Sequence, residues 1–222
     1  QSWRAAGGQD PHDLIDAILA VEIDPQSVAQ FSQQLVDYLI TQRIAPDAAQ
    51  NLAEAWLMSG DYLATNSDHP FDFVVGNPPY VRHEAIPKDL LKRYRAHYRT
   101  MVGRADLYIP FMEKSLDLLS STGKLSFITP NAWVKNDYGK ALRAKIDHEF
   151  HLSHYVDMDG ADAFETVVGA YPAITVIERG RRKAETTRIV TGMDGQWRKR
   201  RLVRGGLPWL TGDSGPVKLI DE

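Results

Sequence analysis

The tetrapeptide Asn77-Pro78-Pro79-Tyr80 follows an apolar segment, Phe71 to Gly76, of the kind that forms a buried strand. The Asn77 side-chain oxygen and the Pro78 carbonyl are two acceptors that can take both N–H groups of a planar amine, such as the exocyclic amine of adenine, and so localise its lone pair. Prolines make the loop rigid. Tyr80 offers a ring on which a flipped base can stack. The alternative is an ordinary proline-rich turn after a strand.

Strands and helices must alternate to position such a loop. Asp24 before Pro25 is a plausible helix start, and Gly123 is placed to end a helix. Short apolar runs predict strands at 17–23, 57–61, 71–76, 125–129, 152–157 and 173–177, and amphipathic spacing predicts helices at 26–40, 46–57, 105–119 and 138–150. This alternation is typical of an α/β domain with a largely parallel sheet. Beyond Arg179 the pattern weakens.

The composition fits one α/β domain, or one domain plus the start of another. The chain has 222 residues, of which 43% are hydrophobic and 25% charged. There is no cysteine, which excludes disulfides and thiolate metal sites. No apolar run approaches the ~20 residues of a membrane span, and the N-terminus lacks the pattern of a signal peptide. We therefore expect a soluble, cytoplasmic protein.

Basic residues gather in two segments. Between Arg179 and Arg204 there are ten Lys or Arg residues against two acidic ones, although the whole chain has a net charge of −3. A second basic stretch, 81–104, includes Arg93, Arg95 and Arg99. A solvated surface is the ordinary interpretation of such runs, but two of them on an acidic body favour contact with nucleic-acid phosphates.

Several motifs together with the tetrapeptide resemble the amino-methyltransferases of restriction–modification systems, particularly the adenine N6 branch. The resemblance runs over about 18–177. It implies that Glu22, at the end of a strand, holds the ribose hydroxyls of the cofactor S-adenosylmethionine, with Ile23 against the cofactor's adenine. It implies that Asp61, in Ser59-Gly60-Asp61-Tyr62, accepts a hydrogen bond from the amine of that adenine.

The resemblance also assigns aromatic residues. Phe111, in the segment from Asp106 to Lys114, corresponds to the residue that packs on the cofactor's adenine, although core packing on an amphipathic helix is an equal alternative. Phe164, in Ala163-Phe164-Glu165, corresponds to the residue that clamps the flipped base opposite Tyr80. Tyr171 competes with it, because that match is loose.

One family motif is not found. A Gly-containing loop that meets the methionine part of the cofactor should precede Glu22, but Gly7-Gly8 has no strand before it. We expect that the chain starts after this motif, and the alternative is a degenerate, inactive copy. The chain would then hold S-adenosylmethionine poorly on its own. A methyltransferase catalytic domain is predicted over 1–180, partial at its N-terminal edge, and a basic connector into a DNA-recognition region over 181–222.

The resemblance implies a Rossmann-like S-adenosylmethionine-dependent methyltransferase sheet with flanking helices, lacking its first strand. It implies transfer of a methyl group to a flipped adenine in double-stranded DNA, without a metal, as part of a restriction–modification system. Any endonuclease, fused or separate, would lie outside these residues. The alternatives are a protein glutamine N-methyltransferase, which uses the same tetrapeptide, and a degenerate domain that only binds DNA. Cytosine N4 is a further alternative as the target.

Overall fold

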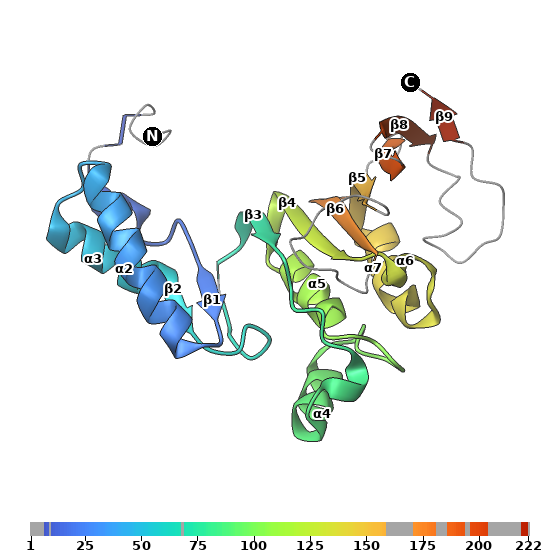
Figure 1. Cartoon of the computed structure of the whole chain (residues 1–222), viewed down its shortest axis with the longest axis horizontal. Coiled ribbons are helices and arrows are strands. Elements are labelled where there is room, and N and C mark those ends of the chain that lie inside the picture. Colours follow the sequence, from blue (N-terminus) through green and yellow to red (C-terminus); the bar gives the residue numbers. More distant parts are fainter. Residues whose placement is uncertain are drawn as a thin grey trace. The chain divides into compact units, whose positions relative to one another are not determined.

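The computed structural model describes residues 7–8, 10–67, 69–158, 171–180, 186–193, 196–203 and 219–221 (Figure 1). The chain forms two compact units, residues 1–66 and 67–222. Each unit has its own sheet, of two and seven strands respectively. None of the helices in the described ranges is both long and apolar enough to cross a bilayer.

The first unit is a pair of parallel strands with two helices. Its elements are the 3-10 turn η1 (Pro11–Leu14), β1 (Ala20–Glu22), α2 (Pro25–Thr41), α3 (Pro46–Trp56) and β2 (Leu57–Ser59). Glu22 at the end of β1 is in register with Ser59 at the end of β2. Helix α2 begins as predicted, because the Asp24 side chain accepts the N–H groups of Gln26 and Ser27 and Pro25 occupies the first turn.

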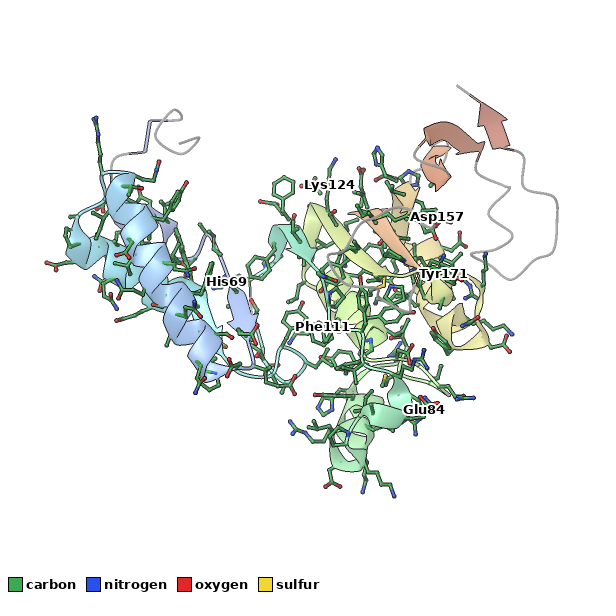
Figure 2. All side chains as sticks on the ribbon, viewed as in Figure 1. His69, Glu84, Phe111, Lys124, Asp157 and Tyr171 are labelled. Carbon is green, nitrogen blue, oxygen red and sulfur yellow. The ribbon has the colours of Figure 1, made fainter. Side chains whose placement is uncertain are left out.

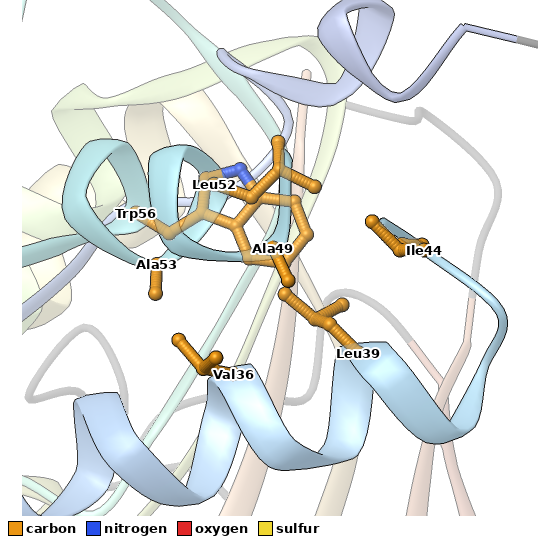
Figure 3. Close-up of a cluster of buried hydrophobic side chains, with 7 residues drawn as sticks. All are labelled: Val36, Leu39, Ile44, Ala49, Leu52, Ala53 and Trp56. Atoms are coloured by element: carbon orange, nitrogen blue, oxygen red, sulfur yellow. The ribbon is translucent and has the colours of Figure 1, made fainter. Parts of the chain in front are cut away.

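A compact apolar cluster joins α2 to α3 (Figure 3). The indole of Trp56 is buried and donates from Nε1 to the carbonyl of Leu14 at 2.7 Å, which ties η1 to the end of α3. Seven buried residues make up this cluster, namely Val36, Leu39, Ile44, Ala49, Leu52, Ala53 and Trp56. The helices of the first unit are therefore fixed by contacts within that unit.

The second unit is built on a seven-stranded sheet in the order β3-β4-β6-β5-β7-β8-β9. The strands are β3 (Phe71–Gly76), β4 (Leu119–Pro130), β5 (Phe150–Asp157), β6 (Pro172–Arg179), β7 (Thr186–Met193), β8 (Gln196–Val203) and β9 (Leu219–Asp221). The sheet is mixed, whereas the sequence predicts a largely parallel one. The pairs β3–β4 and β5–β7 are parallel, but β6 runs antiparallel between β4 and β5, and β8 is antiparallel to both of its neighbours.

Helices of the second unit supply much of its core. They are α4 (Lys88–His97), α5 (Tyr108–Asp117), α6 (Ala132–Lys135) and α7 (Lys140–Glu149), with the 3-10 turns η2 (His83–Ala85) and η3 (Asp137–Gly139). Helix α5 contacts β4 and α7, and α7 contacts β5. Tyr108, Leu116, Leu125 and Leu142 are fully buried between these elements. Helix α4 lies inside the basic stretch, where the sequence analysis predicts no element.

Gly123 does not end a helix. Helix α5 ends at Asp117, and Gly123 lies inside β4, which is longer than the predicted 125–129. A Cβ atom at Gly123 would come within 2.7 Å of the Phe71 carbonyl oxygen. The β3–β4 register shifts between Phe71 and Phe73, so the strands approach closely at this irregularity. The glycine is therefore required by strand packing.

Strands β7, β8 and β9 lie within the segment for which a basic connector is predicted. They continue the large sheet beyond β5. Regular strands therefore form after Arg179, although the sequence pattern there is weak. That this region leads into DNA recognition stays a prediction.

Candidate functional site

The tetrapeptide Asn77-Pro78-Pro79-Tyr80 begins directly after β3, as its apolar strand pattern indicates. It lies at the carboxyl edge of the parallel pair β3–β4, where ligand sites of open α/β sheets gather. Asn77 is exposed and Pro78 is buried. Gly76 packs closely on the adjacent strand, since a Cβ atom there would meet Cε1 of Phe127 at 3.0 Å. The strand end is thus fixed while the Asn77 amide stays accessible.

Tyr80 is half-buried, and its hydroxyl oxygen is shielded from solvent. This hydroxyl forms no hydrogen bond within the part of the chain that the structure describes. Burial raises the pKa of the Tyr80 phenol, so the ring is neutral at physiological pH. A neutral, partly covered ring suits stacking on a base.

Two hydrogen bonds attach the segment after Tyr80 to the start of α5. The Leu107 N–H donates to the Val81 carbonyl at 2.9 Å. The His83 N–H donates to Asp106 Oδ1 at 3.0 Å. We call these two contacts the latch. Desolvation raises the pKa of the Asp106 carboxyl above its ordinary value. The hydrogen bond from His83 lowers this pKa but is the smaller effect. The latch thus fixes residues 81–83, which directly follow the candidate catalytic tetrapeptide.

A buried carboxylate fixes the loop between α4 and α5. Glu113 lies inside the second unit, and its oxygens accept the Arg99 N–H at 3.2 Å, the Thr100 N–H at 2.8 Å and the Thr100 hydroxyl at 2.6 Å. Sequence reasoning gave no role to Glu113 or Asp106. Both stand in the segment from Asp106 to Lys114 that carries the family resemblance, but a one-dimensional pattern does not reveal partners 13 to 23 residues away.

The three predicted phosphate-contacting arginines are all exposed, but they do not form one helical face. Arg93 and Arg95 lie on α4 two positions apart, and Arg99 follows the helix. Arg95 donates from Nη2 to the Gly103 carbonyl at 2.7 Å. Arg95 therefore bridges α4 to the next loop and also presents charge to solvent.

The first unit brings together the residues predicted to hold the adenosine part of the cofactor. Glu22 ends β1 and Asp61 lies two residues after the adjacent end of β2, and the Gly60 N–H donates to the Glu22 carbonyl at 2.9 Å. Ile23 is 69% exposed beside them. An apolar surface flanked by two carboxylates fits an adenosine, since a carboxylate can accept both protons of a vicinal diol. Glu22 Oε1 meanwhile accepts the Asp24 N–H at 3.0 Å.

The candidate aromatic residues belong to the second unit. Phe111 is half-buried on α5, and Tyr171 is 63% exposed just before β6 (Figure 2). The Tyr171 carbonyl accepts the Asn131 N–H at 2.8 Å. Because β6 is antiparallel to β4, Tyr171 lies at the same edge of the sheet as the tetrapeptide. Phe164, the other candidate for the base clamp, lies outside the described residues.

A cavity of about 640 Å³ opens beside the latch. Its walls come from the loop after the tetrapeptide, the loop before α5 and the segment from α6 to η3. The lining includes Arg82, His83, Arg104, Asp106, Asn136 and Tyr138. Separately, no group of three or more His, Cys, Asp or Glu side chains among the described residues is arranged to hold a metal ion.

The mixed sheet with its flanking helices has the fold of one class of solved structures, the S-adenosylmethionine-dependent methyltransferases. A Listeria monocytogenes protein assigned to class I of these enzymes superimposes with a TM-score of 0.54 at 15% identity, covering 77% of this chain and 48% of that one. At this identity the likeness shows the fold alone.

Sequence comparison identifies the family. Residues 17–164 match the family of the Eco57I restriction-modification methylase, and the chain belongs to it. Type II methyltransferase M.PaeR7I of Pseudomonas aeruginosa is 48% identical over 80% of the chain, and M.XhoI of Xanthomonas vasicola is 45% identical over 85%. The Escherichia coli restriction enzyme and methyltransferase RM.Eco57I is 32% identical over 45% of the chain and 10% of its own length. The chain spans 31% of M.PaeR7I and 36% of M.XhoI.

Proposed function

We propose that the protein carrying this chain transfers a methyl group from S-adenosylmethionine to N6 of a flipped adenine in double-stranded DNA. It would act in the cytoplasm as the modification activity of a restriction–modification system. The observation that carries the proposal is the Asn77–Pro78 acceptor pair at the carboxyl edge of β3, in a chain of this family. A partner or fused endonuclease would lie outside this chain, an arrangement that the name of RM.Eco57I supports.

Each residue has a role in this reaction. The Asn77 amide oxygen and the Pro78 carbonyl accept the two N–H groups of the target amine and direct its lone pair out of the ring plane. Tyr80 stacks on the base, and Phe164 or Tyr171 covers its other face. Glu22, Ile23 and Asp61 of the first unit are assigned to the adenosine part of the cofactor, which when bound supplies an electrophilic methyl group. The family resemblance gives Phe111 of the second unit a role towards the same part of the cofactor. Positioning and electrostatics provide most of the rate enhancement.

The exposed arginines support DNA as the substrate. Arg93, Arg95 and Arg99 stand within 30 residues of the tetrapeptide and present cations that suit phosphates. A glutamine side chain in a protein would make little use of them. The relatives M.PaeR7I, M.XhoI and RM.Eco57I are methyltransferases of Type II systems, which also supports a DNA substrate.

The test is nucleoside analysis of DNA after methylation. The full-length protein is incubated with unmethylated bacterial DNA and labelled S-adenosylmethionine, and the digested nucleosides are separated. N6-methyladenine is expected, and its formation should disappear in Asn77→Ala. N4-methylcytosine as the product would overturn the choice of base. Label in protein rather than in DNA would favour the glutamine alternative, and no label anywhere would favour a degenerate domain.

A further inference from the structure

The wall of the cavity beside the latch includes residues that come just after the candidate catalytic tetrapeptide in the chain. Arg82, in its wall, is two residues after Tyr80, and the bonds from Leu107 N–H to Val81 and from His83 N–H to Asp106 hold the segment between them. The cavity is therefore lined by residues that closely follow the tetrapeptide in the chain. The established family assignment gives the cavity no role.

Most charges around the cavity have partners close by. Arg104 is paired with Glu84, whose other oxygen contacts His83 Nδ1 at 2.8 Å. Asp137 is paired with Lys140 at 2.9 Å. By contrast, within the described residues Arg82 forms no ion pair, although its charge acts on the Asp106 carboxyl, and Asp106 accepts a hydrogen bond only at Oδ1, from the His83 N–H. A guanidinium and one carboxylate oxygen remain for a ligand.

These groups select a chemical class. A guanidinium matches a phosphate, and a carboxylate oxygen accepts from the amino group of a base. Tyr138 adds an aromatic ring to the wall, and its hydroxyl lies 3.2 Å from that of Tyr108, which anchors it to the core. Small-ligand sites measure roughly 300–1,000 Å³, so the cavity has room for one nucleotide.

We propose that this cavity receives the nucleotide adjoining the target adenine in the same strand, with Arg82 on its phosphate and Asp106 on the amino group of its base. The inference rests on the proposed function and extends it to sequence specificity. Asp106 has two roles here, since Oδ1 closes the latch and Oδ2 contacts the base. Cytosine or adenine, each of which carries an amino group in the major groove, is then the favoured neighbour.

The phosphate contact is tested by substituting single phosphates. The methylation site of the full-length protein is first mapped on genomic DNA, and duplexes with that site then carry one neutral methylphosphonate at each target-strand position in turn. In the parent enzyme a methylphosphonate beside the adenine should slow methylation about tenfold. Arg82→Gln should be slower on normal DNA but indifferent to that substitution, because glutamine has no charge to pair with the phosphate.

A matched control removes a positive charge elsewhere in the same unit. Lys124 lies in the middle of β4, well separated from Glu84 (Figure 2), and its ammonium contacts Glu178 at 3.1 Å. Lys124→Gln should respond to every methylphosphonate as the parent does. If Arg82→Gln does so as well, the cavity does not hold this phosphate and the inference is wrong. If the parent forms no N6-methyladenine, the proposed function itself fails.

The base contact is tested with Asp106→Asn. The asparagine keeps an acceptor oxygen for the His83 N–H but replaces the other carboxylate oxygen with an amino donor. Among methylated sites on random DNA, preference at one position adjoining the adenine should move about tenfold from amino-bearing bases towards thymine or guanine, which present carbonyl oxygens. A uniform loss of rate without any change of preference would reduce Asp106 to the latch alone and contradict the proposed base contact.

Discussion

The candidate catalytic loop of the second unit and the acidic turns of the first unit are held by different kinds of contact. Beyond Tyr80 the chain is attached by Asp106 across 23 residues, and the next loop by buried Glu113 across 13 or 14. Glu22 instead accepts the N–H of Asp24, two residues away, and Asp61 Oδ1 accepts that of Leu63. The acids that we propose to hold the cofactor thus shape their own turns. The loop after the tetrapeptide depends on distant side chains.

This difference predicts where substitutions will act. Changes in the first unit should alter cofactor affinity and leave folding nearly untouched. Changes in the second unit should divide into those at exposed groups, which affect turnover or DNA binding, and those at buried anchors, which affect the stability of the loop. Four variants test this division in the full-length protein.

The largest effect is expected at Asn77. Asn77→Ala removes one of two acceptors for the reacting amine, and loss of one such preorganised group costs about 10²–10³ in rate. The side chain is exposed, so folding should not change. Single-turnover methylation and equilibrium DNA binding measure the two effects separately. Turnover within tenfold of the parent would refute the assignment, and so would an equal loss of DNA affinity.

The next largest effect is on DNA affinity. Reversal of charge at Arg93, Arg95 and Arg99 together should weaken binding to all sequences about equally and flatten the dependence of log K on log salt by about 0.9 for each phosphate that is no longer neutralised. Binding titrations at several salt concentrations give this slope. Because Arg95 also holds the Gly103 carbonyl, Arg93 and Arg99 should be reversed as a pair for comparison. An unchanged slope would indicate that these arginines do not contact DNA phosphates and are part of an ordinary solvated surface.

Loss of the buried anchor should lower stability. Glu113→Ala leaves the N–H groups of Arg99 and Thr100 without their acceptor, and an unsatisfied buried donor costs about 1–3 kcal/mol. Hydrogen exchange should accelerate mainly in residues 97–101, and denaturant titration gives the change in free energy of unfolding. Glu113→Gln, which retains an acceptor oxygen, should recover part of the loss. Exchange that rises equally over both units would contradict a local anchor.

The smallest effect is expected in the first unit. Glu22→Gln keeps an oxygen for the Asp24 N–H but removes the charge that suits a ribose diol, so S-adenosylmethionine affinity should fall about tenfold with an unchanged melting temperature. Calorimetry measures the affinity. Asp24→Asn is the matched control, since asparagine is an equally good helix cap and Asp24 has no cofactor role. Equal losses of affinity in both variants would indicate a charge effect rather than a diol contact.

Local signals in the sequence predicted local structure well. Asp24-Pro25 begins α2, and the apolar run from Phe71 ends in an exposed Asn77. Both depend on residues close together in the chain. Gly123 shows the limit, because its place is set by the Phe71 carbonyl on another strand. The reversed direction of β6 was equally inaccessible, since periodicity gives a strand's faces but not its neighbours.

The candidate site divides in the same way. Asn77, Glu22 and Asp61 are recognisable because each lies at or within two residues of the end of a strand. Asp106 and Arg82 were missed as members of a cavity because their surroundings come from three separate segments. Phe111 was found by resemblance, and its half-buried position on α5 is compatible with both packing and cofactor contact. The base-facing and cofactor-facing roles of these residues stay predictions.

Strand β4 also bears on how fast each unit folds. It pairs with β3 on one side and β6 on the other, and both partners lie about 50 residues away along the chain. Closing such long loops costs entropy before any pairing is gained, which slows folding. The helices of the first unit, α2 and α3, are consecutive and pack directly on each other. During synthesis the first unit can therefore collapse early. The second edge of β4 stays uncovered until β6 has left the ribosome and can pair with it.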